Sequence, residues 1–260
     1  MSENQVAGGG LLHRRLLFGA GAALIASRDA RATANPHDGS PPSMLKPGAT
    51  MRGYGQPSPY ESAVQRGIGR AMPEIAPGTG VSNTPLQSLD GFITPNGLHF
   101  ERHHNGVPDI DPKTHKLLIH GLVQRPLTFT VEDLLRYPMT SRLVFIECGG
   151  NSSQNSAKEP AQVPFHMVNG RISCAEWTGV PLNLLLDEAG VDMRGKWILA
   201  ESADAAGMSR SIPLDKAMGD TIVALYQNGE RVRPENGYPL RLVVPGWIGN
   251  INVKWLRRIK

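Results

Sequence analysis

The sequence predicts an α+β fold in which mixed β-sheets are combined with short helices, and three observations favour this class. Apolar strand patterns and short helical patterns alternate irregularly. The strand–helix–strand rhythm of a doubly wound parallel sheet is missing, and 29 glycines with 21 prolines predict many turns. In addition, no G-x-G-x-x-G turn opens a helix and no G-x-x-x-x-G-K-(S/T) loop occurs. Dinucleotide and nucleoside triphosphate chemistry therefore lose their usual sequence support.

The expected strands are runs of apolar or β-branched residues bounded by turn residues. The runs over residues 143–146 and 196–200 are apolar enough to predict buried strands. An Asn228-Gly229 pair predicts a tight turn between two strands. The remaining expected strands cover residues 115–120, 222–226 and 240–244.

Two short helices have clear boundary signals. Thr130 is a good cap for a helix that begins at Val131, and Tyr137-Pro138 ends it. A second helix is expected over residues 181–189, because a proline stands in its first turn and Gly190 lies just past its end.

The first 32 residues have the features of a twin-arginine export signal. Arg14-Arg15 precedes an apolar, alanine-rich stretch over residues 16–26, and Ala30-Arg31-Ala32 is a small-residue cleavage site. The apolar stretch is shorter than the roughly 20 residues that a membrane-spanning helix needs, and no later segment comes close. We therefore expect export to the periplasm and no membrane span. Because this route usually carries proteins that are already folded, it favours a bound cofactor.

The rest of the chain divides into two parts. Residues 33–88 are rich in Pro, Gly, Ser and Asn without a sustained period, which predicts an extended segment. Ordered structure is expected to begin near Leu89 and to form one domain over residues 89–260, since 40% of the chain is hydrophobic. The net charge of +4 comes from scattered basic residues, so we expect no nucleic-acid partner.

Cys148 is the most informative single residue. It follows the apolar run over residues 143–146, and Gly149-Gly150 after it lets the backbone turn and another group approach closely. A thiolate in this place suits a soft metal or nucleophilic catalysis, whereas the commoner role of a small cysteine is packing alone. A bridge to Cys174 stays open, although two cysteines make no disulfide framework and we expect free thiols.

Three further clusters supply polar groups. In Phe100-Glu-Arg-His-His104, Arg102 suits bidentate binding of an oxyanion, while two adjacent histidines without a third ligand fit zinc poorly. Arg241 and Lys254, in the clusters over residues 236–241 and 252–254, can neutralise a phosphate. The plainer interpretation is a polar surface loop and solvated charges beside a strand, and no cluster decides between the two by itself.

In order and spacing, these clusters resemble the molybdopterin domain of the sulfite oxidase family over about residues 90–259. The family's F-x-R-(N/H)-H block with its later proline and D-P pair reads Phe100 to His104, Pro108 and Asp111-Pro112. The other matching blocks are Cys148 to Asn151, Trp177 to Leu182, Ser211 to Leu214 with Ala217-Met218, Gly237 to Gly246, and Val253 to Leu256.

This resemblance implies a molybdenum–molybdopterin cofactor, and oxygen-atom transfer to sulfur with two-electron reduction of the metal. It makes Cys148 the thiolate ligand of molybdenum and gives Arg102 a second role in binding the substrate oxyanion. The residues implied to line the pocket are Phe100, Glu101, Arg102, His103 and His104, and those implied to hold the pterin phosphate are Arg241, Asn252, Val253 and Lys254, with Asn236 where many members have histidine.

Two departures from the family pattern bear on the substrate and the architecture. Members that oxidise free sulfite usually carry a basic residue shortly after the cysteine block, where this chain has only polar residues over 151–155. The polar stretch after the cysteine block and the stretch over residues 202–211 together resemble one branch of the family. Members of that branch oxidise sulfane sulfur on a carrier protein and reduce a c-type cytochrome. No C-x-x-C-H haem motif occurs, so electrons are expected to leave through such a partner. The chain stops at Lys260, where typical members continue with an active-site tyrosine and a dimerisation domain, and we expect both to be absent.

The leading interpretation is therefore a periplasmic enzyme that uses molybdenum to oxidise sulfite or carrier-bound sulfane sulfur. One alternative is sulfoxide reduction with the same cofactor. Another is an inactive, truncated remnant that still binds the cofactor.

Overall fold

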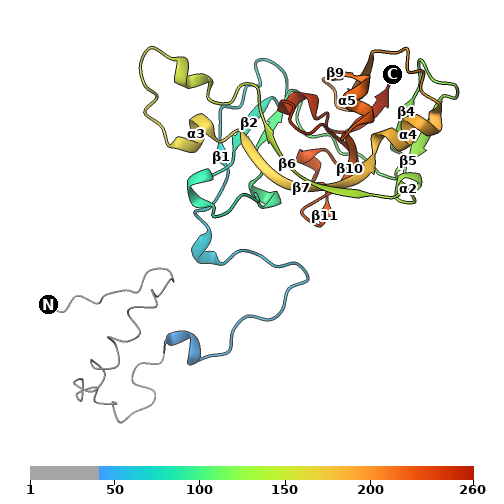
Figure 1. Cartoon of the computed structure of the whole chain (residues 1–260). Coiled ribbons are helices and arrows are strands. Elements are labelled where there is room, and N and C mark those ends of the chain that lie inside the picture. Colours follow the sequence, from blue (N-terminus) through green and yellow to red (C-terminus); the bar gives the residue numbers. More distant parts are fainter. Residues whose placement is uncertain (1–40) are drawn as a thin grey trace, which may run out of the picture. The chain divides into compact units, whose positions relative to one another are not determined.

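The computed structural model describes residues 41–260, so the twin-arginine motif and its cleavage site lie outside the described residues. The chain divides into two units, residues 1–56 and residues 57–260. Of the first unit, residues 41–56 are described, and they contain one short 3-10 helix, η1 (Pro42–Met44). The second unit contains the three sheets described below (Figure 1).

The second unit is built from three β-sheets. The smallest is antiparallel and joins β1 (Gly67–Ile68), β2 (Gly80–Asn83) and β3 (Glu101–His103). A second sheet has the order β11 (Glu230–Arg231), β10 (Ile222–Gln227), β7 (Ile172–Pro181) and β6 (Thr140–Glu147), and β12 (Arg241–Val243) also pairs with β10. The third has the order β5 (Leu127–Thr130), β4 (Lys116–Ile119), β13 (Leu256–Ile259), β8 (Trp197–Ser202) and β9 (Ser209–Pro213).

The helices of this unit are short and join the strands. The α-helices are α2 (Val131–Leu134), α3 (Phe165–Asn169), α4 (Leu182–Ala189) and α5 (Leu214–Met218). The 3-10 helices are η2 (Pro59–Glu61), η3 (Leu86–Ser88), η4 (Asn96–Leu98), η5 (Ser153–Ser156), η6 (Pro234–Asn236) and η7 (Gly249–Ile251). Among residues 41–260, no helix is long and apolar enough to cross a bilayer.

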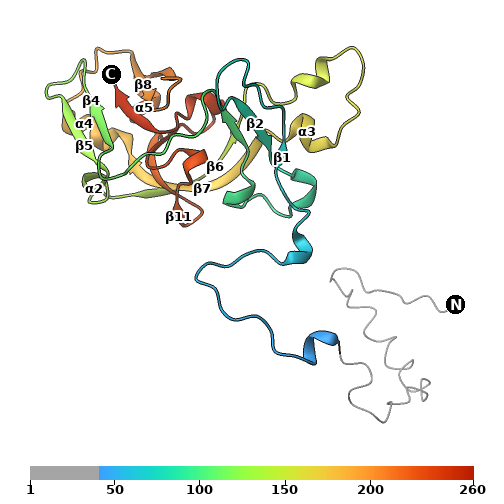
Figure 2. The ribbon, with the colours of Figure 1, turned by 180° about the vertical axis from the view of Figure 1, so that it is seen from behind.

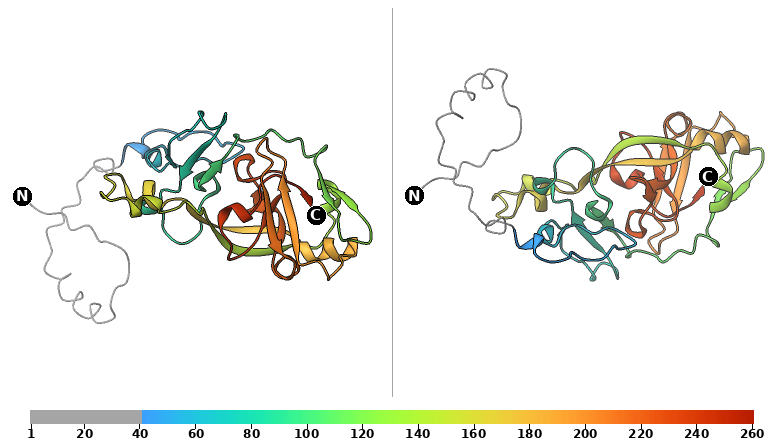
Figure 3. Two further views of the ribbon diagram at one scale, coloured as in Figure 1. Left: turned by 90° about the horizontal axis from the view of Figure 1, so that it is seen from above. Right: turned by 90° about the horizontal axis from the view of Figure 1, so that it is seen from below.

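The arrangement confirms the predicted α+β class with mixed sheets. β13 pairs with β4 in parallel, whereas its pairing with β8 is antiparallel. In Figures 1 and 2, β1 and β2 lie at one end of the second unit and β4 and β5 at the other, with β6 and β7 running between them. Figure 3 shows the C-terminal strand β13 in red at the end that holds β4.

Buried apolar side chains form two clusters in this unit. The larger core packs α4 against β4, β8 and β13 through buried aliphatic residues such as Leu117, Leu186 and Ile259. The smaller core surrounds Trp177, which is fully buried on β7 together with Val144 and Ile146 of β6. Burial of these side chains is the main term that stabilises the sheets that carry the site described below.

Local signals in the sequence predicted the helix ends and the hairpin correctly. Thr130 accepts a hydrogen bond from the Asp133 amide, and the Asp133 side chain accepts one from the Thr130 amide, which completes a capping box. α4 ends at Gly190 in the left-handed region, as expected. Asn228 and Gly229 both have positive φ angles and join β10 to β11, which is the geometry of the predicted tight turn.

Two strand predictions were wrong about burial. Along β6, Val144 and Ile146 are buried, but Leu143 is 58% exposed and Phe145 is 55% exposed. Successive strand residues point to opposite faces, and only one face of β6 meets the core. β8 behaves in the same way, since Ile198 and Ala200 are buried while Trp197 is exposed. An apolar run alone does not show whether both faces of a strand are covered.

Ordered structure also begins earlier than the expected start near Leu89. β2 pairs with β3 over Gly80 to Ser82, and Thr79 to Thr84 contains four residues that are at most 4% exposed. This segment has no sequence period because its polar side chains are buried by hydrogen bonding, as when Thr84 meets Ser173 at 2.6 Å. The division of the chain at residues 32 and 88 stays a prediction.

The close pairing of β7 with β10 depends on the absence of a side chain at Gly179. This residue pairs with Ala224, and a Cβ atom there would overlap the carbonyl oxygen of Val223. We expect Gly179→Ala to lower the free energy of unfolding in urea by about 1–3 kcal/mol, because overpacking moves the backbone. Gly53→Ala, which adds a methyl group where nothing lies within 4 Å, is the control. An unchanged free energy of unfolding in Gly179→Ala would contradict this packing.

Candidate functional site

A cavity that is open to solvent lies where strand ends and loops from all three sheets meet. Nine of the eleven residues predicted for the site line it. They are Phe100, Arg102 and His104 around β3, Cys148 after β6, Asn236 of η6, Arg241 of β12, and Asn252, Val253 and Lys254 between η7 and β13. The structure therefore brings together segments that are more than 150 residues apart in the chain.

Glu101 and His103 do not line the cavity. β3 presents alternate side chains to opposite faces, so Arg102 and the adjacent Phe100 and His104 reach the cavity while Glu101 and His103 point away from it. The sequence motif placed all five on one wall because it carries no information about the strand geometry.

Cys148 stands where β6 ends and the chain turns. Its amide donates to the carbonyl of Arg171 at 2.9 Å, its carbonyl accepts from the Asn151 amide at 2.8 Å, and the Gly150 amide lies 3.5 Å from its Sγ. The thiol is half-buried and free, and so is that of Cys174, which confirms the expectation of free thiols. Backbone hydrogen bonds thus fix a thiol at the cavity wall.

Two guanidinium groups lie near this thiol. Arg102 is tethered by hydrogen bonds to the carbonyls of Gly80 and His103. Burial lowers the pKa of Arg102, the charge of Arg171 lowers it further, and Cys148 opposes this shift. Arg171 was missed in the sequence, because it belongs to the turn before β7. A Cβ atom on Gly150 would lie 3.1 Å from its Nη1, so it supplies a cation that the polar stretch after Asn151 lacks.

Arg241 is a buried cation on the cavity wall. Its Nη1 donates to the carbonyl of Asn236 at 2.8 Å, and its guanidinium carbon lies 4.9 Å from the centre of the Trp177 ring. Its Nε is buried and has no hydrogen-bond partner in the described part of the chain. Burial lowers the pKa of Arg241 to about 9, so the group is charged at neutral pH.

Lys254 is the second cation of the wall, and it is partly buried. Its Nζ lies 3.2 Å from the carbonyl oxygen of Arg102, 3.0 Å from that of Glu235 and 2.9 Å from Nδ1 of His103. Burial lowers the pKa of Lys254 well below its ordinary value, and the neighbouring charge of Arg241 adds to this effect. Within residues 41–260, neither Lys254 nor Arg241 forms an ion pair with a carboxylate.

These cations show what the cavity is suited to bind. Removing a positive charge from water without a partner is costly. A wall with the buried Arg241, the partly buried Lys254 and an unpaired Nε–H therefore favours an anion with several oxygen atoms. A phosphate has that chemistry, and a soft thiol on the same wall suits a metal such as molybdenum. The residues present therefore fit a phosphate-bearing metal cofactor.

Two of the predicted phosphate-binding residues act mainly on the shape of the site. The side chain of Asn252 accepts from the Val244 amide at 2.8 Å and donates to the carbonyls of Trp247 and Ile248, which fixes the loop around η7. The carbonyl of Asn236 positions Arg241, and its side-chain amide donates to Gln227 at 3.1 Å. Their side-chain amides are thus engaged within the protein.

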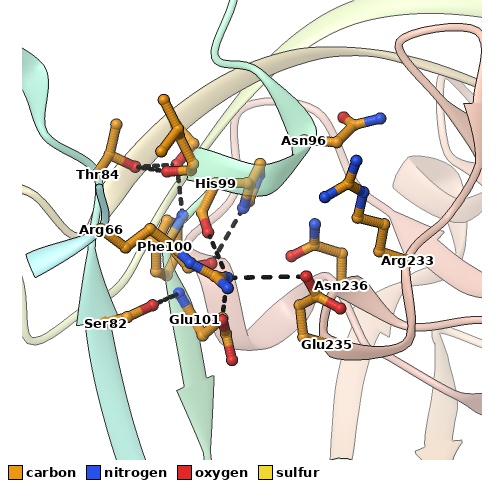
Figure 4. A network of polar contacts seen from close by, with 12 residues as sticks. Arg66, Ser82, Thr84, Asn96, His99, Phe100, Glu101, Arg233, Glu235 and Asn236 are labelled. Carbon is orange, nitrogen blue, oxygen red and sulfur yellow. Dashed lines mark hydrogen bonds and ion pairs between the residues drawn. The ribbon is translucent and has the colours of Figure 1, made fainter. Parts of the chain in front are cut away.

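A polar network supports the wall from behind (Figure 4). Arg66, from the segment before β1, forms ion pairs with Glu101 and Glu235 and donates to the carbonyl of His99 at 3.4 Å. Burial opposes ionisation of Glu101, but the hydrogen bond from His103 and the charge of Arg66 outweigh it and lower its pKa. Arg66 was not foreseen, because its segment was expected to be an extended linker.

The end of β8, the loop after it, η6, η7 and the residue after Lys254 complete the cavity. Their lining residues are Ser202, Asp204, Met208, Glu235, Gly249, Asn250 and Trp255. In the sequence, the stretch over residues 202–211 contributed only to the family resemblance. The spacing of its residues does not predict that they line a cavity. Only the pairing of β8 with β13 puts them there.

Comparisons with known proteins agree with this chemistry. The model of the oxidoreductase molybdopterin binding domain matches residues 104–260. The crystal structure of the sulfane dehydrogenase SoxCD from Paracoccus pantotrophus superposes with a TM-score of 0.80 at 42% identity, covering 87% of this chain and 59% of that chain. The NADPH nitrate reductase of Phytophthora infestans and NADH nitrate reductase 1 of Arabidopsis thaliana are both 36% identical over 68% of this chain. The chain spans about a fifth of the length of each of these two reductases (21%).

The unpaired charge of Arg241 leads to a test on protein without bound ligand. We expect Arg241→Met to raise the free energy of unfolding in urea by about 1 kcal/mol, because an apolar side chain of similar length replaces an uncompensated buried charge. Inorganic phosphate should raise the Tm of the wild type and leave that of the variant unchanged. Arg142→Met, at an exposed position, is the control. A less stable Arg241→Met protein that phosphate still stabilises would refute this role for Arg241.

Proposed function

Because the chain belongs to the family of oxidoreductases with a molybdopterin-binding domain, we propose that it oxidises the sulfur of sulfite or of a carrier-bound sulfane and passes the electrons to a c-type cytochrome. The observation that carries this proposal is the free thiol of Cys148 on a cavity wall that also bears Arg102. The wall thus offers a soft metal ligand and a cation for an anionic substrate.

The residues of the cavity divide into three roles in this proposal. Arg241 and Lys254 hold the cofactor phosphate by charge, and Asn252 keeps the loop before Lys254 in shape. Cys148 binds the metal through its thiolate. Arg102 binds the oxyanion of the substrate, with Arg171 adding positive charge near the thiol.

When bound, the molybdenum cofactor supplies the two-electron oxygen-atom transfer chemistry. The protein contributes orientation and electrostatics. The tether of Arg102 to the carbonyls of Gly80 and His103 fixes its guanidinium before any substrate arrives, which reduces the ordering cost of binding. The ring of Phe100, 7% exposed, keeps water away from part of the wall.

Similarity to the sulfane dehydrogenase supports sulfur as the substrate atom, since it covers more of this chain at higher identity than the nitrate reductases do. The proposal assigns the c-type haem to a partner protein because the given sequence contains no C-x-x-C-H motif. The periplasm is the proposed location, on the basis of the Arg14-Arg15 motif and its apolar stretch.

Substrate assays test the proposal directly. Purified protein loaded with cofactor is mixed with oxidised cytochrome c and either sulfite or a peptide that carries a cysteine persulfide. Reduction of cytochrome c by at least one of the two substrates is the expected result. Reduction of nitrate by an artificial electron donor, with no oxidation of either sulfur compound, would overturn the proposal in favour of nitrate reduction.

The metal-ligand role of Cys148 predicts a selective loss. We expect Cys148→Ser to abolish sulfur oxidation and to lower the molybdenum content, because a hydroxyl is a poor ligand for a soft metal. The free energy of unfolding should change by less than about 1 kcal/mol, because serine is nearly isosteric and the site is half-buried. Turnover equal to that of the wild type would rule out the ligand role. Cys174→Ser is the matched control.

The role of Arg102 predicts an effect on substrate binding. We expect Arg102→Ala to raise the KM for an anionic sulfur substrate about tenfold or more, since it removes a charge-assisted contact of about 1.5–3 kcal/mol. Steady-state kinetics on protein with a matched pterin content separates this effect from loss of cofactor. An unchanged KM would show that the oxyanion is bound elsewhere.

A further inference from the structure

The hydrogen bonds of Lys254 leave its ammonium group no spare donor. A charged lysine has three N–H donors and no acceptor. The carbonyls of Arg102 and Glu235 and Nδ1 of His103 lie within 3.2 Å of Nζ and accept all three. Lys254 therefore acts on a bound anion through its charge, and the state of His103 bears on whether it carries one.

His103 connects Lys254 to a carboxylate. Its Nδ1 faces Lys254 at 2.9 Å, and its Nε2 faces Oε2 of Glu101 at 2.6 Å. Glu101 is held in turn by its ion pair with Arg66. The imidazole stacks on Trp255 with ring centres 6.0 Å apart, and Nζ of Lys254 lies 4.2 Å from the centre of the same ring. Packing thus keeps Lys254, His103 and Glu101 connected in one hydrogen-bonded chain.

The proton shared between Nζ of Lys254 and Nδ1 of His103 can occupy either of two positions. In the first, Lys254 is an ammonium that donates to Nδ1, and neutral His103 donates from Nε2 to the Glu101 carboxylate. In the second, His103 is an imidazolium that donates to both neighbours, and Lys254 is a neutral amine that accepts through its lone pair. The two forms differ by the breaking of the Nδ1–H bond and the formation of an Nζ–H bond. The total charge is the same in both.

We propose that Glu101 and His103 are positioning residues for cofactor binding, which keep a proton on the Lys254–His103 pair and place it on Lys254 when a phosphate enters the cavity. This inference concerns retention of the pterin cofactor. It is independent of which sulfur compound the protein oxidises.

The charges around the pair explain why such support is needed. Burial lowers the pKa of Lys254, and Arg241 on β12 lowers it further, while the carboxylates around it act in the opposite direction. Burial also lowers the pKa of His103, although its hydrogen bond with Glu101 opposes this shift. The charged groups that act on the pair are Glu101 from β3, Asp204 from the loop after β8, Glu235 from η6 and Arg241 from β12.

The sign of the pH dependence follows. Since the proton on the pair attracts phosphate, pterin retention is strongest at low pH and is lost as pH rises through the pKa of the pair in the loaded protein. Removal of the Glu101 charge lowers that pKa, so retention is lost at a lower pH. Removal of the His103 imidazole separates Lys254 from Glu101 and acts in the same direction. Between pH 7 and 10 the phosphate itself does not titrate, because its second pKa is about 6. Arg241, whose pKa burial lowers to about 9, is present in every variant, so the shift between variants reports on the Lys254–His103 pair.

The test measures pterin retention without any sulfur substrate. Loaded wild-type, Glu101→Gln, His103→Asn and Glu101→Asp proteins are passed through gel filtration at pH values from 7 to 10. The pterin that stays bound is quantified by fluorescence after oxidation. Glu132→Gln, on an exposed carboxylate, and His115→Asn, at a buried histidine bonded to the Leu256 carbonyl, are matched controls. The Tm of each protein without cofactor reports any loss of folding stability.

We expect the pH of half-retention to fall by about one unit in Glu101→Gln and His103→Asn, which corresponds to about a tenfold weaker hold on the pterin at a fixed pH above the midpoint. Glu101→Asp, which keeps the charge, should restore most of the shift, and both controls should match the wild type. Midpoints that are unchanged in both variants would overturn the inference. Retention that is reduced equally at every pH, or that follows only the loss of Tm, would show a structural role and would overturn it as well.

Discussion

The site is governed by two cations, the buried Arg241 and the partly buried Lys254, which form no ion pair with a carboxylate within residues 41–260. Arg241 and Lys254 are held on the cavity wall by backbone carbonyls, an imidazole and aromatic rings, none of which carries a full negative charge. Such an arrangement lowers the stability of the empty protein and favours any multivalent anion that fits the cavity. In a protein with a molybdopterin-binding domain, we propose that the phosphate of the cofactor is that anion. Binding of the cofactor is thus expected to restore the stability that the unpaired cations remove from the empty protein.

The sheets serve to hold these charges at a fixed place beside the thiol. β12 carries Arg241 because it pairs with β10, and the loop before β13 carries Lys254 because β13 pairs with both β4 and β8. β6 ends at the turn that presents Cys148. These pairings are non-local, so the cavity exists only when all three sheets have formed. Arg102 does not pack in the core, and its orientation comes from its place in β3 and from its hydrogen bonds to the carbonyls of Gly80 and His103.

Much of the fold and of the cavity was predictable from the sequence, because the relevant signals are local. The cap at Thr130, the glycine after α4 and the Asn228-Gly229 turn act within a few residues of where they stand. Family-like blocks identified the segments around Phe100, Cys148, Arg241 and Lys254, and nine of eleven predicted residues reach one cavity. The sequence did not predict which way individual side chains point from their strands. The exposed Leu143 and Phe145, and the outward-facing Glu101 and His103, depend on which strand face meets the core. Arg66 and Arg171 reach the site through tertiary pairing alone, and no local pattern marks them.

The central claim is that this cavity holds a molybdenum–pterin cofactor through Cys148, Arg241 and Lys254. The most direct measurement is the amount of molybdenum and of pterin per chain in protein purified from cells that make the cofactor. Elemental analysis gives the metal, and fluorescence of the oxidised pterin gives the organic part. The account predicts nearly one of each per chain. Protein that folds normally under cofactor supply and carries neither molybdenum nor pterin would contradict it.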